Sequence, residues 1–343
     1  MNTEKNERIY LFDNLKVILI FLVVFGHCIM IFLNDITIKV YMYIYLFHMP
    51  TFVFISGYFF KRRNKKVLSF ILKYLVFQCL YLLVASIIDK NTNFNISSIF
   101  DPYWIMWYMY CLIFWNIIMN IIEMKNQKTG IILISISIIM AILAGTIENI
   151  NTKYSLSRMI SFFPFFLSGI YCKKFIDIRK IKCSKKVKGI FILIFIAIAL
   201  LTFYLPIANI YEALYYSEPY SVVGITPAIR LLQYIVGFIF ITGFLIIIPN
   251  KKYKLSFIGA STEYIYLLHG LIIMVLQSMS RNYPSISLIF IQDKIKQLIL
   301  YFILTILIIG VILGVVIPFK KLVRRNNLKN KPMNSNLTVW RNS

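Results

Sequence analysis

Three histidines are the residues of this chain best suited to chemistry, because all of them lie inside long apolar segments. They are His27, His48 and His269. An ionisable ring is costly to place within a bilayer and is usually kept there for a function. When the apolar segments cross a membrane in alternating directions, the three rings fall at nearly the same depth, in the outer half of the bilayer. A shared depth predicts a single site.

Two charged residues precede His27 on the same predicted helix. Lys16 lies eleven residues before His27, which is nearly three helical turns, so both side chains project from one face about 16 Å apart along the axis. Asp13 lies close to that face. A lysine near a span end can instead snorkel to the interface, and Asp13 could be the N-cap of the helix. The spacing predicts a face that joins the two sides of the membrane.

The composition predicts an all-α, polytopic membrane bundle. Hydrophobic residues make up 59% of the 343 residues and charged residues 15%, and the mean hydropathy is +0.76; these values are typical of membrane proteins. Apolar runs of about 18 to 22 residues predict ten spans, near 14 to 34, 40 to 60, 67 to 88, 103 to 122, 129 to 147, 158 to 175, 189 to 208, 226 to 248, 255 to 279 and 297 to 318.

The loop charges predict the orientation of these spans. The two termini and every second loop hold 27 basic residues, whereas the loops on the other side hold six. Lys and Arg collect on the cytoplasmic side, so both termini are expected in the cytoplasm of a multi-pass protein of the cell membrane. This topology explains the net charge of +24, and we therefore expect no binding of nucleic acid.

The spans also suggest how the chain is divided. We expect a cytoplasmic N-terminus at 1–13, a membrane domain at 14–319 and a basic, partly disordered cytoplasmic tail at 320–343. Five cysteines are present, but none are in CxxC spacing, so we expect neither a metal site nor a disulfide framework. The sequence leaves the oligomeric state open.

Five stretches of the chain resemble the acyltransferase 3 family of integral membrane acyltransferases, in particular its branch related to fucose 4-O-acetylase. The second carries a His-Met-Pro element and a Ser-Gly-Tyr element, and the fourth runs from Leu-Ser-Arg to Phe-Pro-Phe-Phe. In order along the chain, the stretches are DNLKVILIFLVVFGH (13 to 27), FHMPTFVFISGYF (47 to 59), YWIMWYMYCLIFW (103 to 115), LSRMISFFPFFLSGIY (156 to 171) and STEYIYLLHG (261 to 270).

The resemblance implies transfer of an acyl group, usually acetyl from acetyl-CoA, to a hydroxyl of a cell-surface sugar or a lipid-linked glycan. The family's hallmark in the first span is a basic residue, ten intervening residues and a histidine. The basic residue is often arginine, whereas this chain has Lys16. Lysine keeps the charge but lacks the bidentate fork of arginine.

The residues and the resemblance together suggest roles at the cytoplasmic end. The phosphates of acyl-CoA are expected to bind Lys16, with Asp13 and Arg62 nearby. His27 is the first choice for the general base that activates the acceptor hydroxyl, and His48 is the second. Covalent transfer through an acyl-histidine is an alternative.

Four further residues are candidates for binding the acceptor. Arg158 and Trp107 lie near the outer ends of their spans, while His269 and Tyr264 lie in the ninth span. Arginine and tryptophan at such positions can also be interface anchors. Glu263, near mid-membrane, needs a partner, for which Lys16 is a candidate.

Two other classes of protein fit parts of the pattern. An exporter or flippase of a glycan precursor would also have many spans and buried ionisable groups, but it would more often show repeat symmetry and discontinuous helices, and no repeat is apparent. A membrane sensor would leave the aligned histidines unused. The sequence therefore favours the acyltransferase.

Overall fold

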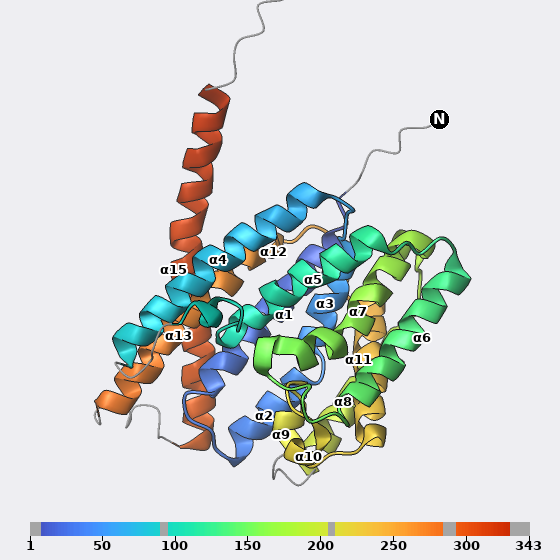
Figure 1. Cartoon of the computed structure of the whole chain (residues 1–343), viewed down its shortest axis with the longest axis horizontal. Helices are drawn as coiled ribbons and strands as arrows, with labels where there is room; N and C mark the ends of the chain where they lie inside the picture. The colour runs from blue at the N-terminus through green and yellow to red at the C-terminus, as the bar shows by residue number, and fades with distance from the viewer. Residues whose placement is uncertain (1–7, 90–94, 205–209, 284–292, 330–343) are drawn as a thin grey trace, which may run out of the picture.

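The computed structural model describes residues 8–89, 95–204, 210–283 and 293–329, and within these ranges it is all-α, with no strand. Long helices run roughly antiparallel around a shared interior, and short helices fill the connections (Figure 1). The long helices are α1 (Tyr10–Ile29), α2 (Asp35–Tyr45), α3 (His48–Tyr58), α4 (Asn64–Ile88), α5 (Trp107–Ile121), α6 (Gln127–Ala144), α7 (Leu156–Phe175), α8 (Lys185–Tyr204), α11 (Pro227–Ile247), α13 (Thr262–Asn282) and α15 (Lys294–Lys329).

Nine segments of the described chain are long and apolar enough to cross a membrane, with α2 and α3 together counting as one. The protein is therefore a multi-pass membrane protein. Each of the nine corresponds to one of the ten predicted spans. The remaining one, the sixth, is helix α7, which is not among the nine. Its arginine, serines and proline lower its hydropathy, and it is packed between α3 and α6.

The second span is broken just before the histidine that it carries. Helix α2 ends at Tyr45 and α3 begins at His48, and Phe47 between them has a non-helical backbone. Pro50 explains the break, because proline has no N–H to donate to the carbonyl four residues earlier, and its ring clashes with that carbonyl. His48 therefore opens a new helix, with its side chain fully inside the bundle.

Two glycines hold α3 against α7. A Cβ atom on Gly57 would lie 2.0 Å from the carbonyl oxygen of Phe166, and one on Gly169 would lie 2.0 Å from that of Phe54. Only glycine permits two helix backbones to approach so closely. This contact fixes the helix that carries His48.

The ninth span is also interrupted, and its first part packs on α1. The predicted segment divides into the short helix α12 (Ser256–Gly259) and helix α13. A Cβ atom on Gly259 would lie 2.3 Å from the backbone oxygen of Asp13, and α1 also packs against α13. The helices that carry His27 and His269 are therefore neighbours.

The last helix is longer than the sequence predicted. Helix α15 continues to Lys329 and projects beyond the bundle (Figure 1), so residues 320–329 of the expected tail are helical. Basic residues near a helix C-terminus favour such an extension, because they complement the negative end of the helix dipole. The rest of the expected tail, 330–343, and residues 1–7 of the expected N-terminus lie outside the described residues.

Candidate active site

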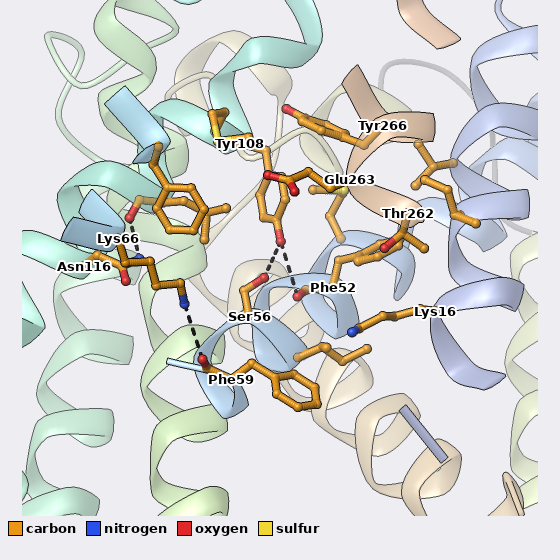
Figure 2. Close-up of a pocket in the computed structure, with 17 residues that line it drawn as sticks. Lys16, Phe52, Ser56, Phe59, Lys66, Tyr108, Asn116, Thr262, Glu263 and Tyr266 are labelled. Carbon is orange, nitrogen blue, oxygen red and sulfur yellow. Dashed lines mark hydrogen bonds between the residues drawn. The ribbon is translucent and has the colours of Figure 1, made fainter. Parts of the chain in front are cut away.

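A cavity of about 330 Å³ lies at the end of the bundle that carries the loop KRRNKK; we call it the lysine cavity. Lys16 of α1 and Lys66 of α4 enter it from opposite sides, with Phe59 between them (Figure 2). The Lys16 ammonium lies 4.6 Å from the centre of the Phe59 ring, and the Lys66 ammonium donates to the Phe59 carbonyl oxygen at 3.3 Å. Two cations therefore converge on one opening.

The remaining polar groups of the lysine cavity are already paired. Tyr108 and Ser56 share a hydrogen bond of 2.5 Å between their hydroxyls (Figure 2). Glu263 forms an ion pair of 2.5 Å with Lys73. The sequence had suggested Lys16 as the partner of Glu263, and this suggestion was wrong, because α4 places Lys73 beside the start of α13. Lys16 has no ion pair within the described residues, so its charge is available to a ligand.

A second cavity, of about 180 Å³, lies deeper along α1; we call it the histidine cavity. Its polar and aromatic wall comes from α1, α2, α3, α5, α7 and α13, from the segment before α5, and from the segment that follows the short helix α9 (Ile210–Ala213). The residues of this wall are His27, Tyr41, Tyr45, His48, Trp104, Trp107, Arg158, Phe162, Tyr215 and Tyr266. The expected meeting of His27 and His48 in one cavity is therefore observed.

The two cavities adjoin. Val23, Met49 and Tyr266 line both of them, so the face of α1 that bears Lys16 and His27 runs past both spaces. The sequence predicted this shared face from the spacing of the two residues.

His48 and His269 have fixed ring orientations. The Nδ1 atom of His48 lies 2.9 Å from the carbonyl oxygen of Ile44, and that of His269 lies 2.9 Å from the carbonyl oxygen of Ile265. A carbonyl oxygen can only accept a hydrogen bond, so Nδ1 carries the proton in both rings. In the neutral ring, Nε2 is then an acceptor.

His27 is held by rings rather than by the backbone. Its ring centre lies 5.4 Å from that of His269 and 4.9 Å from that of Trp104. The His27 side chain is only partly buried, and it lines the histidine cavity. His269 is fully buried behind it. His269 thus lies against His27 and is not among the residues that line the cavity.

Arg158 brings a positive charge to the histidine cavity. Its Nε donates to the carbonyl oxygen of Tyr215 at 3.2 Å, and its guanidinium lies 5.3 Å from the centre of the Trp107 ring. No carboxylate within the described residues pairs with it. Burial raises the pKa of Tyr215 to about 12, so the phenol remains a neutral hydrogen-bond donor at the cavity wall.

Besides His269, three of the predicted site residues line neither cavity. Asp13 forms an ion pair of 2.6 Å with Arg8 and lies in the first turn of α1, so it is not the N-cap. Arg62 donates to the carbonyl oxygen of Ile122 at 2.9 Å, at the end of α5. The ring of Tyr264 lies 4.3 Å from the ammonium of Lys320.

The sequence analysis also missed residues that do line the cavities, and Lys66, Trp104 and Tyr266 are the most important of them for the proposed chemistry. Trp104 has a φ of +43°, a left-handed conformation that costs about 1–3 kcal/mol and is often found at functional sites. Tyr266 precedes His269 by three residues and so shares its helix face. That spacing was a usable signal, whereas nothing in the sequence indicated the strained backbone of Trp104.

The fold and these cavities define a class: a multi-pass helical membrane protein with a cationic cavity that adjoins one containing histidine. Within the described residues, no group of three His, Cys, Asp or Glu side chains could hold a metal ion. The family described as the acyltransferase domain, acyltransferase 3, matches residues 9–317. The chain therefore belongs to the acyltransferase 3 family, and it is a membrane acyltransferase. No curated protein and no solved structure matches it.

Proposed function

We propose that this protein moves an acetyl group from cytoplasmic acetyl-CoA to a hydroxyl of a cell-surface sugar or a lipid-linked glycan, with His27 as the general base. This activity is that of the branch related to fucose 4-O-acetylase. The observation that carries the proposal is the adjoining pair of cavities, one with Lys16 and Lys66 at its opening, neither of which forms an ion pair within the described residues, and one with His27 and His48 in its wall.

The donor is assigned to the lysine cavity. Lys16 and Lys66 offer two positive charges for the phosphates of the nucleotide end of CoA, and Lys66 here takes the place that the sequence gave to Arg62. The apolar wall between Lys16 and Val23 suits the pantetheine arm. The thioester would then reach the boundary that Val23, Met49 and Tyr266 form between the cavities.

The acceptor is assigned to the histidine cavity. Trp104 and Trp107 offer flat aromatic surfaces, which bind the apolar face of sugar rings, and Arg158 offers charged hydrogen bonds to hydroxyls or to a phosphate. Tyr266, rather than Tyr264, lies in position to contact the acceptor. A hydroxyl held here would lie between His27 and the incoming thioester.

The transfer moves one proton from the acceptor hydroxyl to His27 and then from His27 to the CoA sulfur. His27 Nε2 takes the proton of the acceptor hydroxyl while the oxygen of that hydroxyl attacks the thioester carbonyl. The carbon–sulfur bond breaks, and the CoA sulfur leaves with the proton that His27 returns. An ester and free CoA are the products, and no further reactant is required. His48 is the alternative base, because its Nε2 is also an acceptor.

Mass spectrometry of surface glycans tests the proposal. Cells that carry the intact gene, a deletion, or His27→Gln should be compared, each with equal amounts of protein in the membrane. We expect an O-acetyl group that is present with the intact gene and absent in the other two. Identical glycans in all three would refute a glycan acceptor.

A further inference from the structure

The three histidines differ in what their Nδ1 atoms contact. In His48 and His269, Nδ1 bonds to the carbonyl oxygen four residues earlier in the helix, at 2.9 Å in both cases. The same bond from His27 would reach Val23, but the Nδ1 of His27 is buried and has no hydrogen-bond partner among the described residues. His27 therefore has a polar atom inside the protein that its own helix does not satisfy.

A second buried nitrogen without a partner lies on the neighbouring ring. The Nε2 atom of His269 is also buried, and no group in the described part of the chain bonds to it; the two ring centres are 5.4 Å apart. Buried polar atoms without a partner are costly and uncommon. Two such atoms on adjacent rings satisfy each other if one is a donor and the other an acceptor. The bond from Nδ1 of His269 to Ile265 already makes its Nε2 the acceptor.

We propose that His269 is a positioning residue that fixes the tautomer of His27. The Nδ1–H of His27 donates to Nε2 of His269 through one bridging water molecule, or directly after a small rotation of the His27 ring. The proton of His27 is thereby held on the buried side of the ring, and its Nε2 lone pair is directed to the histidine cavity. The value of this arrangement for acyl transfer rests on the proposed function, because only a base needs a free lone pair there.

The surroundings of His269 hold its ring in place. Tyr81 of α4 donates to the carbonyl oxygen of Leu267 at 3.1 Å, and a Cβ atom on Gly270 would lie 2.3 Å from the Tyr81 hydroxyl oxygen. Helix α13 is thus locked against α4 on both sides of His269. Trp104 also contacts the His27 ring edge-on, which restricts the rotation of this ring.

The test reads the tautomers directly by nitrogen NMR. The chain has only three histidines, so protein labelled with ¹⁵N-histidine in lipid nanodiscs gives three ring pairs, which His48→Gln and His269→Gln assign. We expect Nδ1–H on all three rings of the wild type. In His269→Leu, which removes the acceptor but keeps an apolar side chain, His27 should change mainly to Nε2–H, the form preferred by a free imidazole.

Two controls keep the result interpretable. His269→Gln retains an acceptor oxygen and should preserve Nδ1–H on His27, while an unchanged His48 signal shows that each variant is folded. Turnover should fall in His269→Leu, but by less than the hundredfold to ten-thousandfold loss, roughly, that follows removal of a general base; the KM for acetyl-CoA should be unchanged, and turnover should recover in His269→Gln. The inference is overturned if His27 carries its proton on Nε2 in the wild type, or keeps Nδ1–H in a folded His269→Leu. Because the NMR needs no substrate, this outcome is independent of the proposed function.

Discussion

The two cavities differ in how their functional groups are held. In the lysine cavity, the groups that face the opening are ammonium ions on long side chains, and one rests on the face of Phe59. In the histidine cavity, the groups are rings whose orientation is set by backbone carbonyls and by packing against other rings. A flexible cation suits the recognition of a phosphate, whereas proton transfer requires a fixed geometry.

This difference in rigidity explains why we assign donor binding to the lysine cavity and proton transfer to the histidine cavity. Long side chains lose more conformational freedom when they are fixed, so a mobile cation attracts a charged donor without a costly prior ordering. A rigid ring, in contrast, must be in place before the acceptor arrives. We therefore expect substitutions in the lysine cavity to change binding of the donor, and those in the histidine cavity to change the rate of transfer.

The largest effect is expected at His27. His27→Gln keeps a hydrogen bond to the acceptor but cannot take its proton at neutral pH, so turnover should fall about a hundredfold to ten-thousandfold. His27→Ala should be no more active. Steady-state transfer by purified protein in nanodiscs measures this loss. Activity within a few-fold of wild type in folded His27→Gln would move the role of base to His48.

A smaller effect is expected at Arg158, in the same cavity. A charged hydrogen bond is worth about 1.5–3 kcal/mol, so Arg158→Gln should lower kcat/KM for the acceptor about tenfold to a hundredfold. Arg158→Lys keeps the charge and should recover part of the loss. The KM for acetyl-CoA should stay unchanged in both. A rise in the KM for acetyl-CoA alone would mean that Arg158 binds the donor instead of the acceptor.

A few-fold effect is expected at Lys66, which tests the lysine cavity. Lys66→Ala should raise the KM for acetyl-CoA about fivefold, because a partly solvated ion pair contributes at most about 1 kcal/mol. Lys65→Ala is the matched control, since Lys65 is exposed and does not line the cavity. Equal effects of the two substitutions would mean that acetyl-CoA is attracted by a general positive surface and not by the lysine cavity.

Gly57→Ala is expected to change the difference between the two cavities least, because α3 lines both of them. The added Cβ would meet the Phe166 backbone at 2.0 Å, and such overpacking costs about 1–3 kcal/mol of stability. Thermal unfolding in detergent should show the loss. The KM for acetyl-CoA and the turnover number should change together or not at all. A change in only one of them would mean that the cavities do not share this wall.

The sequence predicted those features that depend on a single helix. Lys16 and His27 share a face because eleven residues are nearly three turns, and the structure places both along the adjoining cavities. The span pattern also predicted the all-α membrane bundle. The depth argument correctly brought His48 to the cavity of His27, since the position of a residue along its span does not depend on how the helix is rotated.

What the sequence could not predict depends on how helices are rotated against one another. Glu263 was given the wrong partner because Lys73 comes from α4, which had not been placed beside α13. Tyr264 was named as a candidate, whereas Tyr266, which lines both cavities, was not considered. Residues two apart on a helix are separated by about 200° and point in nearly opposite directions. The place of Trp104 in the cavity wall depends on its left-handed backbone conformation, which no residue pattern in the sequence indicates.

Equilibrium binding of acetyl-CoA to purified, folded variants tests the division of labour between the cavities most directly. His27→Gln should bind acetyl-CoA as tightly as the wild type while being inactive in transfer. Lys16→Ala should bind it several-fold more weakly, and Lys16→Arg should bind it nearly as well as the wild type. Loss of binding in His27→Gln, or unchanged binding in Lys16→Ala, would contradict the assignment of donor recognition to the lysine cavity and of proton transfer to the histidine cavity.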